Sequence, residues 1–297
     1  MAKIGFIGLG NMGLPMAGNL VKKGHEVKGF DILDDNLTKA AQAGVKKVAS
    51  AADAARDVDF VLTMVPTGRE TIAVYEGAGV FAAAKKGTLF IDASTIDVAS
   101  AKKAHELAQK AGMLSLDAPV SGGTGGAQGA TLTFMCGGTA EAFAKGKAAL
   151  EGMGRKIVHC GDAGMGQAVK ICNNMMMAIN MLGVCEGFAL AERLGLSHQT
   201  LFDVVSTATG NSFALSGYCP VPGPVPSTPA NRDYAPGFMT TLLVKDLTLA
   251  QSAAQETGTA TPMGAQALAT FRHYMTLAGA DHRDFSSVME YVRGKAK

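Results

Sequence analysis

The 297-residue sequence is poor in charge and in uninterrupted apolar runs, and each shortage excludes a class of protein. Charged residues make up 18% and the net charge is +2, so the chain has no electrostatic basis for binding nucleic acid or a membrane surface. The apolar runs contain polar residues or are too short to cross a bilayer. The first residues also lack the basic and apolar segments of a secretory signal. We therefore expect a globular, cytoplasmic protein.

Cysteines that pair by spacing are also missing. The five cysteines are an odd, scattered set without a C-x-x-C motif: Cys136, Cys160, Cys172, Cys185 and Cys219. This pattern is typical of thiols in a reducing compartment and does not indicate a disulfide framework. His159 precedes Cys160, but no second pair follows at metal-ligand spacing, so no metal site is predicted.

Hydrophobic residues make up 47% of the chain, which is enough for real cores, and the length favours two domains. The first half alternates strand-like runs with helical patterns, which predicts βαβ units and a parallel, doubly wound sheet. The strand-like runs are residues 3–8, 26–31, 60–65, 88–92, 114–117, 131–136 and 156–159. The helical patterns are residues 11–23, 34–43, 50–55, 99–111 and 140–153.

The second half has few strand signals. Residues 166–194 form one long helical pattern that is apolar nearly all round, which predicts a helix buried between domains or subunits. Further helices are expected at residues 199–208, 242–256, 262–278 and 285–293. We therefore predict an α/β domain at residues 1–163, followed by an all-α domain at residues 164–297 that carries substrate-binding and oligomerisation surfaces.

Residues 216–238 contain six prolines, which exclude a helix or a central strand there. The segment is long for an idle connection in a compact domain. A linker is one interpretation. The interleaved aromatic residues favour a lid or a subunit contact instead: Tyr218, Tyr234 and Phe238.

A glycine motif follows the first predicted strand: Gly8, Gly10 and Gly13 are spaced as G-x-G-x-x-G, with Asn11 and Met12 between the last two. Its position between a strand and a helix predicts a dinucleotide site. The glycines would permit the turn, the approach of the pyrophosphate and close helix packing, and the helix N-terminus would supply N–H groups.

The next predicted strand ends at Asp31, whose carboxylate would bind the ribose hydroxyls and repel a 2′-phosphate, so NAD is favoured over NADP. Val65 and Pro66, after a later strand, are expected to line the adenosine side. Thr95 is expected to bind the nicotinamide ribose, although Thr95 or Asp97 could instead cap the following helix.

Residues 117–126 combine Ser121 with glycines that include Gly122 and Gly123. Unshielded backbone N–H groups and a hydroxyl form a nest that suits an anion, most simply a carboxylate. A flexible hairpin loop is the alternative.

Hydride transfer to a nicotinamide requires a group that moves the hydroxyl proton. The six histidines show no carboxylate partner at a strand end in the sequence, and most lie on patterns typical of a surface. Lys170 lies in the first turns of the long apolar helix, where desolvation would lower its pKa, and Asn174 follows at i+4 on the same face. A Lys170 that extends its ammonium to solvent is the alternative. Asn173 receives no role.

Lys245 begins a second long helical pattern and could reach the nicotinamide, with Asp246 orienting it. An ordinary surface ion pair between the two is the alternative. Phe238, at the end of the proline-rich segment, is a further predicted cofactor contact.

Four stretches resemble the β-hydroxyacid dehydrogenase family, in the right order over nearly the whole chain: FIGLGNMGLPMAGNL, DAPVSGGTGGAQGATLTFM, GQAVKICNN and KDL. The resemblance implies a Rossmann domain, an all-helical second domain, and a homodimer or homotetramer. It also implies Lys170 as general acid and base, Ser121–Gly123 as the carboxylate site and Asn174 as the amide that orients the substrate. Thr95 and Lys245 are implied cofactor contacts.

Within the family, SGGTGGA, IVHCG and RDYAPGF resemble the branch that oxidises 3-hydroxyisobutyrate in valine breakdown. We therefore expect NAD-dependent oxidation of a small hydroxy-carboxylate to its semialdehyde. Two alternatives stay open: a tartronate or succinic semialdehyde reductase of the same family, and a dinucleotide-binding interaction module without catalysis.

Overall fold

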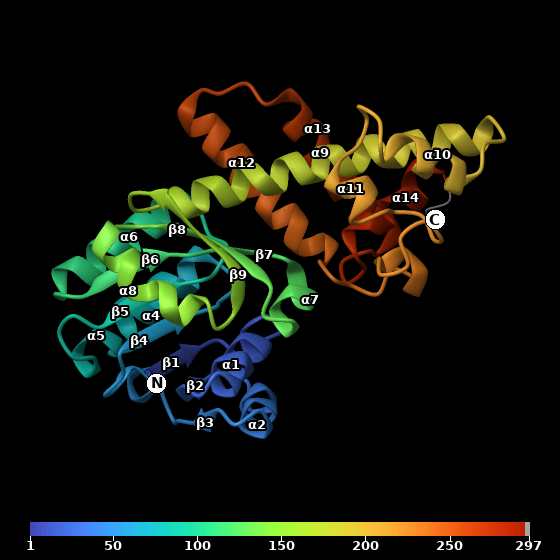
Figure 1. Cartoon of the computed structure of the whole chain (residues 1–297). Helices are drawn as coiled ribbons and strands as arrows, with labels where there is room; N and C mark the ends of the chain where they lie inside the picture. The colour runs from blue at the N-terminus through green and yellow to red at the C-terminus, as the bar shows by residue number, and fades with distance from the viewer. Residues whose placement is uncertain (295–297) are drawn as a thin grey trace. The chain divides into compact units, whose positions relative to one another are not determined.

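The computed structural model describes residues 1–294 and shows two compact units, the first at Met1–Lys170 and the second from Ile171 onward (Figure 1). The predicted domains 1–163 and 164–297 divide the chain shortly before that point and stay a prediction. Residues 295–297 of the predicted second domain lie outside the described residues.

The first unit contains one sheet with the strand order β3-β2-β1-β4-β5-β6-β8-β7, and β9 pairs with β8. The strands from β3 to β6 are parallel, as the alternation of strands and helices predicts. The strands are β1 (Lys3–Ile7), β2 (Glu26–Phe30), β3 (Lys46–Lys47), β4 (Phe60–Thr63), β5 (Leu89–Asp92), β6 (Leu114–Asp117), β7 (Val120–Ser121), β8 (Leu132–Gly137) and β9 (Gly154–Gly161).

Helices cover both faces of this sheet, because alternate strand residues belong to two different cores. Leu62 and Ile91 face one core, which includes residues of α1 and α8, whereas Val61 and Phe90 face the other, which includes residues of α3 and α6. The helices are α1 (Gly13–Lys22), α2 (Asp34–Gln42), α3 (Ala51–Ala55), α4 (Gly68–Gly77), α5 (Val80–Ala83), α6 (Val98–Lys110), α7 (Gly123–Gln128) and α8 (Ala140–Leu150).

Three features of the first unit differ from the sequence prediction. The sheet is mixed, since β8 runs antiparallel to β6 and β7. The helices α4 and α5 were not predicted. The last four residues of the predicted glycine-rich loop, 123–126, belong to the helix α7, whose last carbonyl groups accept hydrogen bonds from Asn19 Nδ2 of α1. Asn19 and the end of α7 are more than a hundred residues apart in the sequence, so no local sequence pattern predicts this contact.

The second unit is helical, as predicted. The helix α9 (Met165–Arg193) begins in the last residues of the first unit, and its part from Ile171 onward belongs to the second unit. Leu247 of α12, Phe271 of α13 and Phe188 of α9 meet in its core. Its other elements are α10 (His198–Val205), α11 (Phe213–Ser216), η1 (Pro229–Arg232), α12 (Thr240–Thr257), α13 (Pro262–Ala278), η2 (Phe285–Ser287) and α14 (Val288–Val292).

The long helix α9 is buried along one side only. Met181 and Phe188 lie fully inside the helical core, whereas Met176 and Leu190 are more than half exposed. One side of α9 is therefore open in the single chain, and the prediction that this helix is buried between domains or subunits stays a prediction. Among the described residues α9 alone is long and apolar enough to cross a membrane, a criterion that core helices also meet.

The proline-rich segment is ordered around one carboxylate. Asp284 is fully buried, and its Oδ2 accepts hydrogen bonds from Tyr218 Oη and from the backbone N–H groups of Gly237 and Phe238. Its Oδ1 accepts from the N–H and hydroxyl of Ser286. The prediction that proline excludes helix fails locally, since a 3-10 turn forms at Pro229–Arg232, where proline occupies the first turn.

Candidate active site

The glycine motif lies at the carboxyl end of β1, between β2 and β4, where the strand order changes direction. Ligands of doubly wound sheets bind at this position. Gly8 has a φ of 92°, and a Cβ there would lie 2.2 Å from the carbonyl oxygen of Met64. A Cβ on Gly13 would lie 1.9 Å from the carbonyl oxygen of Gly8. Both glycines are therefore required by the tight turn itself.

Gly10 is different, because no atom lies within 4 Å of the place that its Cβ would take. The folded chain alone would therefore accept a side chain at Gly10. A ligand that approaches the backbone closely would not, because the side chain would occupy its place. The helix α1 also begins without a side-chain cap and without an acidic residue in its first turn. The motif, including Asn11 and Met12, thus fits the pyrophosphate of a dinucleotide.

Asp31 follows β2 and lies beside the glycine motif, as the sequence suggests. Its Oδ2 accepts a 2.6 Å hydrogen bond from the N–H of Leu9, and its Oδ1 accepts one of 2.8 Å from the N–H of Leu33. The carboxylate is therefore fixed at the end of β2, where the ribose hydroxyls of a dinucleotide bind.

The segments after β4 and β5 are joined to each other by hydrogen bonds. The N–H of Val65 donates to Ser94 Oγ at 2.9 Å, which places the Val65–Pro66 turn beside the Thr95 segment. Asp97, not Thr95, caps α6: its Oδ1 accepts from the N–H of Ser100. The capping alternative for Thr95 is thereby removed.

Gln167 connects α9 to the same segment. Its Nε2 donates to the carbonyl oxygen of Ser94 at 2.7 Å, and its Oε1 accepts from the N–H of Ile96 at 3.1 Å. Thr95 therefore lies between two residues that are bonded to Gln167. Lys170 follows Gln167 by three residues, about one helical turn, and its side chain is largely buried at 7% exposure.

Ser121 ends β7, which pairs with β8 next to Thr133. Gly122 follows with a φ of 131°, and a Cβ there would lie 3.2 Å from Leu132 Cδ2. Gly123 is the first residue of α7, also with a positive φ. The predicted nest for an anion is thus a strand-to-helix turn that leaves Ser121 and Gly123 partly exposed.

Asn174 has partners that fix its amide. Its Nδ2 donates to Asp246 Oδ2, and its Oδ1 accepts a 3.0 Å hydrogen bond from Asn173 Nδ2. Asn173 thereby gains the role that the sequence did not supply, which is to orient its neighbour. On α9, Lys170 and Asn174 lie on the same face at i and i+4.

Lys245 and Asp246 form an ion pair, with 3.5 Å between Nζ and Oδ1. Asp246 is 2% exposed, so the alternative of an ordinary surface pair is wrong. Oδ1 has no hydrogen-bond partner, and its attraction to Lys245 offsets part of the cost of its burial. Phe238 is held next to Asp284 and stacks edge-on against Phe285.

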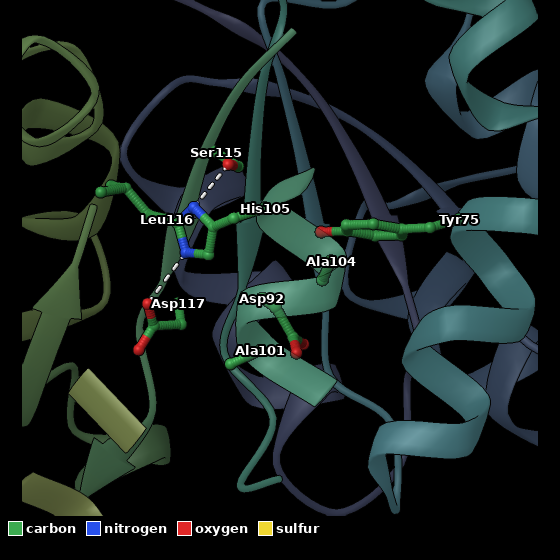
Figure 2. Close-up of a pocket in the computed structure, with 8 residues that line it drawn as sticks. All are labelled: Tyr75, Asp92, Ala101, Ala104, His105, Ser115, Leu116 and Asp117. Atoms are coloured by element: carbon green, nitrogen blue, oxygen red, sulfur yellow. Dashed lines mark hydrogen bonds and ion pairs between the residues drawn. The ribbon is translucent and has the colours of Figure 1, made fainter. Parts of the chain in front are cut away.

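Three polar residues near the predicted site were missed by the sequence analysis. Asp117 ends β6 and is 1% exposed, and its carboxylate binds both α9 and His105. The expectation that no histidine has a carboxylate partner at a strand end is therefore wrong for His105 (Figure 2). Gln167 is the third of the polar residues that the sequence analysis missed. A local pattern carries no signal for such long-range partners.

A second buried carboxylate lies on the neighbouring strand. Burial raises the pKa of Asp92, although hydrogen bonds from Ser94, Thr63 and Thr71 act in the opposite direction. Tyr75, Asp92 and Asp117 line one small cavity, and burial together with the charge of Asp92 raises the pKa of the Tyr75 hydroxyl. Among residues 1–294 no group of His, Cys, Asp and Glu is arranged to hold a metal ion.

Comparison with known proteins agrees with this geometry. A protein-family model described as the NAD binding domain of 6-phosphogluconate dehydrogenase matches residues 3–161. A second, described as NAD-binding of NADP-dependent 3-hydroxyisobutyrate dehydrogenase, matches residues 164–292. A probable 3-hydroxyisobutyrate dehydrogenase of Mycobacterium tuberculosis is 49% identical, over 100% of this chain and 99% of its own. The chain belongs to the 3-hydroxyisobutyrate dehydrogenase family.

Other members show the breadth of this family. An NAD-dependent L-serine dehydrogenase of Pseudomonas aeruginosa is 43% identical, over 98% of this chain and 97% of its own. A solved structure of the Mycobacterium tuberculosis 3-hydroxyisobutyrate dehydrogenase with L-serine matches with a TM-score of 0.93 and 49% identity, over 99% of each chain.

Membership of this family makes the chain an NAD-dependent hydroxyacid dehydrogenase, with a Rossmann domain followed by a helical domain. The predicted cofactor NAD and the predicted family are confirmed. The alternative of an interaction module without catalysis is not supported, since the similar proteins are dehydrogenases.

Proposed function

We propose that the protein oxidises 3-hydroxyisobutyrate to methylmalonate semialdehyde with NAD, as in valine breakdown, and that Lys170 is the general base. The position of Lys170 is the main support. It is buried, and it lies one turn after Gln167, whose side chain is bonded on both sides of Thr95 at the end of β5. If Thr95 binds the nicotinamide ribose, a lysine there would be suited to proton transfer.

Each residue of the proposed mechanism has one task. The N–H groups of Gly122 and Gly123 and the hydroxyl of Ser121 bind the substrate carboxylate. Lys170, neutral before the reaction, accepts the hydroxyl proton on Nζ as the O–H bond breaks. Asn174 orients the substrate oxygen. NAD would supply the hydride acceptor when bound; the hydride would leave the carbon that bears the hydroxyl group, so that the carbinol becomes an aldehyde.

Cofactor binding is assigned to the residues that the sequence analysis selected. Gly8, Gly10, Asn11, Met12 and Gly13 would hold the pyrophosphate. The further contacts proposed are Asp31 to the adenosine ribose, Val65 and Pro66 to the adenosine side, Thr95 to the nicotinamide ribose, and Phe238 and Lys245 to the nicotinamide half.

L-serine is the second candidate substrate. It is a 3-hydroxy acid in which an amino group replaces the methyl group, and a relative at 43% identity is an L-serine dehydrogenase. Tartronate or succinic semialdehyde remains a third option, with reduction as the reaction. We further propose that the protein is cytoplasmic. We also propose a homodimer or homotetramer, because exposed apolar side chains such as Met176 and Leu190 lie along α9.

The test is a substrate panel combined with the variant K170A. The parent enzyme is expected to show its highest kcat/KM with 3-hydroxyisobutyrate and NAD. K170A should lose at least about a hundredfold in kcat, the usual contribution of a general base, while NADH still binds. The exposed Lys103 supplies the control, K103A, which should behave like the parent.

Two results would count against the proposal. A K170A variant with near-normal turnover would remove Lys170 as the base. A higher kcat/KM with L-serine or with a semialdehyde than with 3-hydroxyisobutyrate would assign the enzyme to that substrate instead.

A further inference from the structure

The beginning of α9 is held by the buried carboxylate of Asp117. Its Oδ1 accepts a 2.8 Å hydrogen bond from the N–H of Gly164, and its Oδ2 accepts one of 2.9 Å from the N–H of Gln167. Both oxygens therefore bind main-chain donors at the N-terminus of a 29-residue helix. A charged acceptor at this end of a helix is stronger than a neutral cap.

The surrounding backbone makes room for this carboxylate. A Cβ on Gly166 would lie 2.7 Å from Asp117 Oδ2 and 2.2 Å from the carbonyl oxygen of Met135. A Cβ on Gly137 would lie 2.5 Å from Asp117 Oδ1. Side chains at these positions would thus push the strand and the helix away from Asp117.

His105 holds the other side of Asp117 (Figure 2). Its Nε2 lies 2.9 Å from Asp117 Oδ1, and its Nδ1 lies 2.6 Å from Ser115 Oγ. The residue types resemble a hydrolytic triad, but the adjoining cavity of about 10 Å³ has room for no more than a water molecule. Asp117 is moreover engaged by α9. The arrangement is a support for the carboxylate and not a nucleophilic site.

Asp117 therefore connects two parts of the proposed reaction site, the carboxylate nest at Ser121 and the first turn of α9 with Lys170. It precedes Ser121 by four residues on the segment that leads to the carboxylate nest. It also binds Gln167, one turn before Lys170. Because Gln167 is fixed by its side chain as well, the first turn of α9 is held against both rotation and sliding.

We propose that Asp117 is a positioning residue of the dehydrogenase reaction: through the cap on α9 it sets the distance of Lys170 from a hydroxy acid bound at Ser121. This inference rests on the proposed function, in which Lys170 moves the proton. Displacement of a reacting group by about 1 Å can lower a rate a hundredfold, so a weakened cap is expected to act on the chemical step.

The test is the variant D117N. Asparagine keeps the size of aspartate but turns an NH₂ group toward one of the two N–H donors, so one cap bond is lost. We expect kcat per NADH-binding site to fall about tenfold to a hundredfold, with little change in the KM for substrate. The solvent deuterium isotope effect on kcat should rise, and amides of residues 162–172 should exchange faster with deuterium.

The matched control is T139A. Thr139 caps α8 of the same unit through a hydrogen bond from the N–H of Ala142, so its loss weakens a helix start that carries no proposed catalytic group. T139A is expected to lower the melting temperature without changing kcat per NADH-binding site or the isotope effect.

A second variant decides the matter if D117N does not fold. H105A leaves the cap bonds in place and removes only the hydrogen bond from His105 to Asp117, so it should show the same changes at smaller size. Unchanged kcat, isotope effect and exchange in the folded variant would overturn the proposal, as would a loss explained by the folded fraction alone. A K170A variant with near-normal kcat would contradict the proposed role of Lys170 itself. An inactive K170A together with a D117N variant of parental kcat would contradict only the proposed role of Asp117.

Discussion

Asn174 Nδ2 donates a 2.6 Å hydrogen bond to Oδ2 of Asp246, a residue 72 positions later in the chain. Both side chains are 2% exposed. A carboxylate can only accept hydrogen bonds, so the amide must turn its NH₂ toward Asp246. Its oxygen consequently faces the other way, toward Asn173. The orientation of Asn174 is therefore set by α12 and not by α9 alone.

The bond between Asn174 and Asp246 predicts strong coupling in a double-mutant cycle. N174A and D246A should each lower kcat/KM, and the double variant should lose less than the sum, with a coupling energy of about 1–3 kcal/mol. Steady-state kinetics with NAD and the best substrate measure it. Pairing D246A with T139A provides a comparison in which the effects should add. Additive losses in the first pair would show that the bond does not matter for catalysis.

Ser121 is expected to act on substrate binding more than on turnover. S121A removes one hydroxyl from the proposed carboxylate nest, which should raise the KM for the hydroxy acid about tenfold and leave kcat nearly unchanged. The partly exposed Ser206 supplies a control, S206A, with parental kinetics expected. An S121A enzyme with the parental KM would place the carboxylate elsewhere.

Asp31 should control the choice between NAD and NADP. D31A removes the carboxylate that would bind the ribose hydroxyls and also releases the N–H of Leu9, so the Kd for NAD should rise about tenfold or more. The Kd for NADP should rise less or fall, because a repulsive charge is gone. Fluorescence titration measures both constants. Asp34, paired with the exposed Lys47, gives the control D34A.

The ion pair of Glu192 and Arg293 predicts a pH-dependent stability. Burial alone would raise the pKa of Glu192, but hydrogen bonds from Arg293 and His198 outweigh it and hold that pKa below its ordinary value. A carboxyl with a lowered pKa in the folded state stabilises the fold above its unfolded pKa. That contribution is lost as the pH falls through the folded value.

R293A should therefore reduce the free energy of unfolding by about 1–2 kcal/mol at neutral pH, allowing for solvent screening of partly exposed groups. The difference from the parent should shrink as the pH is lowered through the folded-state pKa of Glu192. Urea unfolding at several pH values measures this. A difference that is constant with pH would mean that Arg293 acts through packing.

The sequence predicts features whose cause is local. The spacing of Gly8, Gly10 and Gly13, with Asp31 at the end of the next strand, is dictated by one turn and one strand, so it is visible without a structure. Helix and strand periodicity likewise predicts the parallel half of the sheet and the helical second unit.

Features that depend on distant partners were beyond the sequence. Asp117 and Gln167 are 50 positions apart, and Ser94 and Gln167 are 73 apart, so no spacing rule connects them. The same holds for His105, which has the surface pattern of an amphipathic helix but turns inward to Asp117. Small residues that make room for a carboxylate, such as Gly166, also give no sign of what they accommodate.

Asp284 has a consequence for the length of the proline-rich segment. It binds Tyr218 near one end of the segment and Gly237 near the other, and so closes the intervening chain into a loop. The entropy of closing a flexible loop grows slowly, by about 0.6 kcal/mol for each doubling of length. An insertion or deletion between these two residues that leaves Val221 and Tyr234 buried should therefore add little closure entropy, provided that the carboxylate remains.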